Sequence, residues 1–315
     1  MCIFFFFERN KLTKKGILNV SLFHFHGKSF RDVQRKFGLK SQIKSQETIG
    51  VKSDFPFLAG LGVIGGFYIF LIVAMLAADA FFTSPWYLLK AMGSREIRYA
   101  IKLSLLSCTL TTLLSLWVAV PIGYLMSRYE FRGKALLDGI LDIPIVLPPL
   151  VIGLSLLILF QTPLLKYFDR HIVAVTYAVP SVILAQFMVA CAFAVRTMRT
   201  TFEQISPRAE QVALTLGCSR RQAFWMVVLP EARCGMIAAA TVAWARALGE
   251  FGPILIFSGA TRMKTEVLPT TVFLELSVGN IEAAVAVSLL MVLLAVVVLV
   301  IVRKYGGGRD LGRLL

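Results

Sequence analysis

Two oppositely charged side chains, Arg246 and Glu250, lie in an otherwise apolar run over residues 235–257. If that run crosses a membrane, a charge at its depth costs about 2.5–3.5 kcal/mol on insertion scales. Glu250 follows Arg246 by four residues, which places both on one helix face, where they can pair. Two interpretations are open: a structural ion pair, or an aqueous path in which Arg246 attracts a dianion. Gly249 and Gly252 flank Glu250 and would permit close helix approach or unwinding in either case.

No other group of residues has the spacing of a catalytic or metal site. The histidines and cysteines are scattered, without carboxylates or partners at ligand spacing; they are His24, His26, His171, Cys2, Cys108, Cys191, Cys218 and Cys234. Gly27-Lys28-Ser29 matches the end of a phosphate-binding loop, but position 22 is Leu where that loop needs Gly. We therefore predict no catalytic residue, no metal and no bound cofactor, and any ATP would be used by another chain.

The composition excludes a soluble enzyme. Of the 315 residues, 57% are hydrophobic and only 16% are charged, against about 25% charged in soluble domains; the mean hydropathy is +0.75. A net charge of +15 would suggest nucleic acid in a soluble chain. In a membrane protein, basic residues instead collect in cytoplasmic loops and at anionic lipid. We expect an integral membrane protein in contact with lipid and with no nucleic-acid partner.

Six stretches reach the roughly 20 apolar residues that a transmembrane helix needs. They are Phe57–Ala78, Leu103–Leu125, Ile140–Phe160, Ile172–Ala194, Gly235–Phe257 and Ala283–Val302. Residues 1–54 are basic and polar. They predict a disordered cytoplasmic leader, or a segment that is included only because the start codon was assigned too far upstream. Residues 55–98 would hold the first span and its loop, and residues 303–315 a cytoplasmic tail.

Basic residues concentrate in the leader, the loops after the second and fourth spans and the tail, which places both termini in the cytoplasm. Asp138 and Asp142 flank the start of the third stretch, where negative charge is favourable.

Residues 206–230, between the fourth and fifth stretches, predict two short helices joined by a tight turn. Ser206 is a favourable N-cap, Gly217 ends the first helix, and a capping box at Ser219 starts the second, which we expect to end at Pro230. Apolar residues recur at helical spacing in the first helix, at Ala209, Val212, Ala213 and Leu216. Spacing alone leaves two alternatives, an amphipathic pair lying on lipid or an element on which a partner docks.

This segment resembles the loop signature of ABC importer permeases, E-x-x-A, then G, nine residues, a β-branched aliphatic residue, x and L-P. The matching residues are Glu210, Ala213, Gly217, Val227, Leu229 and Pro230. Val212 departs from the family, which often has a second Ala there. In the family the segment is a coupling helix that sits in a groove of the ATP-binding subunit. The resemblance implies that Ala209, Val212 and Ala213 are buried contacts, Glu210 a charged anchor and Gly217 the turn.

The resemblance extends over residues 99–302, where we expect the ABC type I transmembrane domain. Leu141–Leu156, with its prolines, looks like the third span of oxyanion permeases. Ala245–Gly252 and Gly259–Glu266, followed by Leu268-Pro269, are similar to molybdate, tungstate and sulfate permeases, and most closely to the molybdate/tungstate branch.

The resemblance implies an all-α membrane protein with the six transmembrane helices of a type I ABC importer permease, located in the cytoplasmic (inner) membrane. The implied function is oxyanion import, of molybdate or tungstate, with sulfate or thiosulfate as the alternative. The implied partners are two ATP-binding subunits that use ATP, an extracytoplasmic oxyanion-binding protein and a second copy of this chain. An ion-coupled secondary transporter is the remaining alternative, because it too would show kinked helices and an intramembrane Arg–Glu pair.

Overall fold

The structure is a computed structural model that describes residues 55–82 and 92–306. The predictions for the 1–54 leader, including His24, His26 and Gly27-Lys28-Ser29, lie outside the described residues. Helix α4 (Phe55–Phe82) covers the first apolar stretch. The boundary between two compact units of the chain, Met1–Ala74 and Met75–Leu314, falls inside this helix.

All regular structure in the described residues is helical. Four of these helices are long and apolar enough to cross a membrane, over Phe57–Phe82, Arg95–Arg128, Val179–Gln204 and Ile281–Val302. Two helix pairs pass the same test jointly but are bent, by 110° between Lys134–Val146 and Pro149–Gln161 and by 69° between Arg220–Glu231 and Arg233–Leu248. The described chain therefore holds four to six candidate spans, in agreement with the predicted all-α membrane fold.

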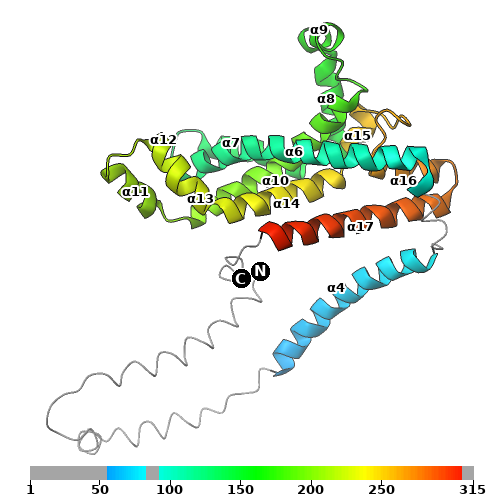
Figure 1. The fold of residues 1–315 in the computed structure, drawn as a ribbon, viewed down its shortest axis with the longest axis horizontal. Coiled ribbons are helices and arrows are strands. Elements are labelled where there is room, and N and C mark those ends of the chain that lie inside the picture. The colour runs from blue at the N-terminus through cyan, green and yellow to red at the C-terminus, as the bar shows by residue number, and fades with distance from the viewer. Residues whose placement is uncertain (1–54, 83–91, 307–315) are drawn as a thin grey trace, which may run out of the picture. The chain divides into compact units, whose positions relative to one another are not determined.

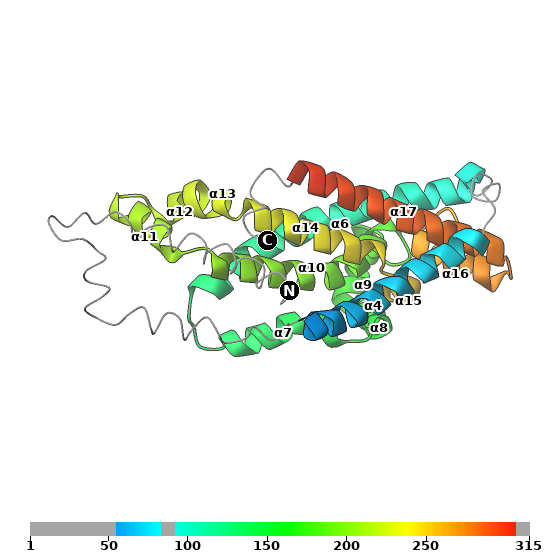
Figure 2. The same cartoon turned by 90° about the horizontal axis from the view of Figure 1, so that it is seen from below.

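The second unit is built around α6 (Arg95–Arg128), α10 (Val179–Gln204) and α14 (Arg233–Leu248), which lie side by side in both views (Figures 1 and 2). Small side chains fill the buried face of α6, at Ala100, Ser104, Ser107, Cys108, Thr111, Ser115 and Ala119, and they allow close approach of neighbouring helices. Gln186 of α10 is 1% exposed. Its side chain accepts a hydrogen bond from Thr111 of α6 (3.3 Å) and donates one to the Ala247 carbonyl of α14 (3.1 Å), so it joins all three helices.

The third and fifth apolar stretches are each interrupted by a break in the helix. In the third stretch, α7 (Lys134–Val146) ends before Pro148, and α8 (Pro149–Gln161) begins directly after it. Leu147 is extended (ψ 140°) because a following proline disfavours the helical conformation. In the fifth stretch, α14 ends at Leu248, and α15 (Gly252–Phe257) begins after three residues without helix.

The fourth span begins later than predicted. The short helix α9 (Pro163–His171) occupies the preceding loop, residues 172–178 contain no helix, and α10 starts at Val179. Asp169 stabilises this connection, since its Oδ1 accepts hydrogen bonds from the backbone N–H groups of Val175 (2.6 Å) and Thr176 (2.8 Å). Two more helices, α16 (Leu268–Ser277) and α17 (Ile281–Gly306), follow α15.

Candidate functional site

The 206–230 loop begins as its sequence predicts. Helix α11 (Pro207–Thr215) starts at Ser206, whose hydroxyl accepts a hydrogen bond from the Arg208 N–H (3.4 Å). Gly217 provides the turn with φ +90°, a conformation that favours glycine. The capping box at Ser219 then starts α12 (Arg220–Ala223).

The second helix of the loop differs from the prediction, because it does not stop at Pro230. The five residues Phe224–Val228 form the π-helix η1, and α13 (Leu229–Glu231) continues from it. Pro230 has no N–H to donate, and it lies in the first turn of α13, where a missing donor is tolerated. Leu229 and Pro230 therefore connect the loop to α14 rather than end a helix. Single π-turns of this kind occur frequently at functional sites.

The predicted contact residues of α11 divide into two groups. Ala213 is buried within this chain, whereas Ala209 and Val212 are exposed. We call the exposed apolar residues of the loop the loop ridge; its members are Ala209, Val212, Leu216, Trp225 and Met226. Figure 1 shows α11 and α12 beyond the ends of α6, α10 and α14. The ridge residues of α11 therefore lie at the end of the unit where α11 and α12 project, and all five ridge side chains are exposed within the described part of the chain.

Glu210 faces inward, toward the end of α6. Its carboxylate accepts a hydrogen bond from the Tyr124 hydroxyl, and Oε2 lies 3.5 Å from Nε of Arg128. The Arg128 and Glu210 side chains are only 11% and 12% exposed. Arg128 also donates to the Ile205 carbonyl (3.0 Å), and the Tyr124 ring packs edge-on against Phe224 of η1, with 4.8 Å between ring centroids. These contacts attach the loop to α6. Sequence spacing gave no signal for Tyr124 and Arg128, which lie more than 80 residues before Glu210.

Arg246 and Glu250 form the ion pair that their spacing allows, with Nη1 2.7 Å from Oε2. The Glu250 side chain is 1% exposed and that of Arg246 is 31% exposed. Within the described residues, neither carboxylate oxygen of Glu250 accepts a well-aligned hydrogen bond. The guanidinium also lies 5.7 Å from the centre of the Phe193 ring. Among the described residues, Arg246 is thus the one ion-pair partner of Glu250.

The two helix interruptions meet at a cavity of about 320 Å³, which we call the break cavity. Its lining residues are Pro148, Pro149, Leu150, Arg246, Gly249, Glu250, Phe251 and Gly252. The backbones of α8 and α15 approach closely beside it. A Cβ atom on Gly252 would lie 3.0 Å from Cβ of Pro149, and one on Gly153 would lie 2.7 Å from Cα of Pro253. Glycine at both positions is therefore needed for this contact.

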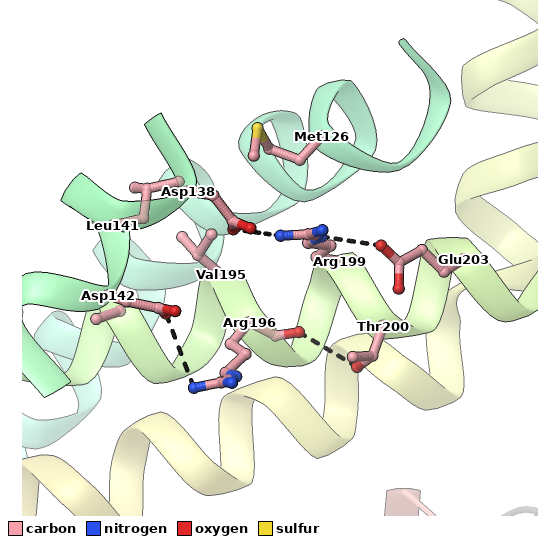
Figure 3. A pocket seen from close by; sticks show the side chains of 10 residues that line it. Met126, Asp138, Leu141, Asp142, Val195, Arg196, Arg199, Thr200 and Glu203 are labelled. Atoms are coloured by element: carbon pink, nitrogen blue, oxygen red, sulfur yellow. Dashed lines mark hydrogen bonds and ion pairs between the residues drawn. The ribbon is translucent and has the colours of Figure 1, made fainter. Parts of the chain in front are cut away.

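A second charged cluster joins α7 to α10 around a cavity of about 270 Å³ (Figure 3). Arg199 binds Asp138 and also Glu203, at 2.9 Å from its Nε, and Arg196 lies 3.8 Å from Asp142. Asp138 and Asp142, predicted to favour a helix start, instead provide ion-pair partners for α10. The four-residue spacing of the acids and the three-residue spacing of the arginines could have indicated this pairing. Among the described residues, no group of three His, Cys, Asp or Glu side chains could hold a metal ion.

The chain is similar to known membrane transport proteins. Residues 119–306 match the family described as binding-protein-dependent transport system inner membrane component. The sulfate transport system permease protein CysW of Synechocystis is 30% identical over 81% of this chain and 94% of its own length. The molybdate/tungstate permease protein WtpB of Pyrococcus abyssi is 36% identical over 54% of this chain and 64% of its own length.

A solved structure of a bacterial alginate ABC transporter, in complex with an alginate-bound periplasmic protein, has the same fold. Its TM-score is 0.64 with 18% identity, covering 81% of this chain and 94% of that one. The sequence relatives carry the names of both sulfate and molybdate/tungstate systems, and CysW covers more of this chain than WtpB does. The relatives therefore do not single out the molybdate/tungstate branch. The family match and the relative covered almost along its full length show that the chain belongs to the binding-protein-dependent transport system inner membrane components, the type I permeases of ABC importers.

Proposed function

We propose that this permease imports a tetrahedral oxyanion, such as sulfate, molybdate or tungstate, using ATP hydrolysed by partner subunits. Two ATP-binding subunits would dock on the 206–230 loops of two copies of this chain, and an extracytoplasmic binding protein would deliver the ion. Both termini and the 206–230 loop would face the cytoplasm, where ATP is available.

The observation that carries the proposal is the loop ridge, an exposed apolar surface on a rigidly attached element. Val212 is 57% exposed, Leu216 80% and Met226 70%. An apolar patch of this kind marks a contact with protein or lipid. The Glu210 contacts with Tyr124 and Arg128 fix the loop on α6, so a partner that moves the ridge also moves a candidate span. This rigid attachment favours a docking element over a helix pair that only lies on lipid.

Transport would follow from a shift between two conformations. ATP binding closes the pair of ATP-binding subunits, and the loop passes this motion to α6 through Glu210 and to α14 through η1 and α13. The opening between the two copies then changes from one side of the membrane to the other. ATP drives the change because it favours one conformation over the other.

The oxyanion class rests on the names of the relatives and on Arg246. Sulfate, molybdate and tungstate are dianions of the same tetrahedral shape, and an arginine suits such an ion because its planar guanidinium offers several donors. CysW covers the larger share of the chain, so sulfate is the first ion to test. Molybdate is the second, because the WtpB relatives also match.

The docking role predicts that Val212→Asp removes the ATP-binding subunit from the purified complex. Val212 is exposed, so the new carboxylate leaves this chain's own packing intact but would be buried in the interface. An unpaired charge buried in an interface costs several kcal/mol, so we expect binding to weaken by at least about tenfold. The measurement is co-purification in mild detergent of the tagged chain with its ATP-binding subunit.

Gln211→Asp is the matched control, because Gln211 lies on the polar face of the same helix and is also exposed. Equal retention of the ATP-binding subunit in both variants would contradict docking at the ridge. If the wild-type chain elutes alone, while complexes of known importers stay intact in the same procedure, ATP hydrolysed by partner subunits is not its energy source. Ion-coupled transport then replaces the proposal. Stimulation of ATP hydrolysis by the binding protein, loaded with sulfate or with molybdate, then identifies the ion.

A further inference from the structure

The break cavity has the features of a place where an ion passes. Irregular backbone at membrane depth is tolerated only where it is buried in protein or lines a water-filled cavity. Here two interruptions, at residues 147–148 and 249–251, meet at one cavity. Its volume of about 320 Å³ far exceeds the roughly 10–15 Å³ that one water requires. An oxyanion with part of its hydration shell fits this space.

The charges of the cavity favour an anion that binds only briefly. Arg246 is the one cation and Glu250 the one acid among its lining residues. The Arg246 side chain is 31% exposed, so it can reach an ion in the cavity, whereas Glu250 is 1% exposed. A buried carboxylate that lacks hydrogen bonds depends on its ion-pair partner, since removal of one member leaves an uncompensated charge. Glu250 therefore continues to attract Arg246 while an anion is bound.

We propose that Arg246 contacts the oxyanion during its passage, and that Glu250 is the internal counter-ion that holds Arg246 when the cavity is empty. The inference rests on the proposed function and names the residues that perform it. An arginine without Glu250 would bind a dianion tightly and release it slowly. Competition from Glu250 makes the contact weak, as conduction requires an ion both to enter a site and to leave it.

The first test uses Glu250→Gln in the full complex with the ATP-binding subunits and the binding protein. The substitution removes the competitor and leaves the volume nearly unchanged. We expect labelled sulfate or molybdate to be retained by the complex about tenfold more strongly, the change that one charge-assisted hydrogen bond implies. Uptake into proteoliposomes should slow, because release is slower. Unchanged retention would overturn the proposal.

The second test uses the double variant Arg246→Gln/Glu250→Gln, which removes both charges and so leaves no buried charge unpaired. ATP hydrolysis stimulated by the loaded binding protein should persist, while the number of ions imported per ATP falls by about tenfold. The control is Glu130→Gln/Lys134→Gln, which removes another ion pair of the same four-residue spacing, 2.6 Å long, away from the cavity. Equal coupling in both double variants would overturn the proposal.

Two further outcomes separate the possible causes. If the wild-type complex assembles but imports none of the three oxyanions, the proposed function fails, whereas normal wild-type import with unaffected variants defeats only this inference. Arg246 could instead bind the headgroup of an anionic lipid. Vesicles of phosphatidylcholine alone, with no anionic lipid, should show the same variant effects; effects that require anionic lipid would assign Arg246 to lipid and overturn the proposal.

Discussion

The 206–230 loop and the break cavity each place a glutamate against an arginine, yet the two pairs are built differently. Glu210 binds Arg128 and also accepts a hydrogen bond from Tyr124, and Arg128 donates in turn to the Ile205 carbonyl. In the described part of the chain, the Glu250 carboxylate has one ion-pair partner, Arg246, four residues away. The first pair joins distant elements, whereas the second joins neighbours across the end of one helix.

This difference indicates which pair can change its partner. A carboxylate with several donors loses all of them when it moves, so the Glu210 contacts form a fixed joint. A carboxylate with one ionic partner and no aligned hydrogen bond breaks no such bond when that partner moves to contact a transported anion. The same Glu→Gln substitution should therefore loosen the structure at position 210 and strengthen anion retention at position 250.

The largest effect on stability should come from the close backbone contact beside the break cavity. In Gly153→Ala the new Cβ would lie 2.7 Å from Pro253 Cα, so α8 and α15 must separate. Overpacking of this kind costs about 1–3 kcal/mol. In the 206–230 loop, the Cβ atom of Gly217→Ala would have no other atom within 4 Å. Its cost is only the backbone strain of alanine at a φ of +90°, about 1–2 kcal/mol. In thermal unfolding of the purified complex, the melting midpoint of Gly153→Ala should be lower than that of Gly217→Ala.

Gly139→Ala is the control for both, because Gly139 lies inside α7 with nothing within 4 Å of its added Cβ and no positive φ. Alanine is the better helix former there, so its melting midpoint should equal or exceed that of the wild type. If Gly153→Ala and Gly139→Ala have the same melting midpoint, the tight contact between α8 and α15 does not support the break cavity.

The next effect tests Glu210 as a fixed joint. Glu210→Gln removes the ion pair with Arg128 and weakens the hydrogen bond from Tyr124, at a cost of about 1.5–2 kcal/mol. Amide hydrogens of α11 should then exchange roughly tenfold faster, since α11 opens more often when it is less firmly attached. Glu231→Gln is the matched control, because Glu231 is exposed at the end of α13, directly after the loop. Similar exchange rates in the two variants would show that Glu210 does not hold the loop.

Local signals predicted the loop well and its attachment not at all. The N-cap at Ser206, the turn at Gly217 and the capping box at Ser219 depend on residues within one helical turn, so sequence alone identifies them. Tyr124 and Glu210 meet across 86 residues of chain, and nothing near either residue indicates the other. The docking roles of Ala209, Val212 and Ala213 and the role of Arg246 stay predictions.

The helix interruptions show the same limit. The Pro148-Pro149 pair explains locally why α7 ends, but the bend of 110° between α7 and α8 depends on the packing of α8 against α15. Periodicity could not distinguish a straight span from a broken one, because both are uniformly apolar. Gly249 and Gly252 indicated that unwinding was allowed at Glu250, although packing decided that it occurs.

The smallest effect concerns Asp169, a carboxylate with several donors like Glu210 but at a more exposed site. Burial raises the pKa of Asp169, but hydrogen bonds from the Thr176 and Val175 N–H groups outweigh this and lower the pKa below its ordinary value. A lowered pKa in the folded state means that the stabilisation is complete above the unfolded pKa of about 3.9. It is then lost as the pH falls through the folded value.

Asp169→Asn should therefore lower the free energy of unfolding at pH 7 by less than about 1 kcal/mol, because a partly exposed site is screened by solvent. The melting midpoint should fall slightly. The difference between variant and wild type should shrink as the pH falls below about 4, where the wild-type carboxylate also takes up a proton. Lys166→Gln, exposed in the same short helix, serves as the control. If Asp169→Asn lowers stability as much as Glu210→Gln, the number of hydrogen-bond donors, rather than burial, determines how firmly these carboxylates hold their elements. The contrast between the 206–230 loop and the break cavity would then depend on hydrogen bonding alone.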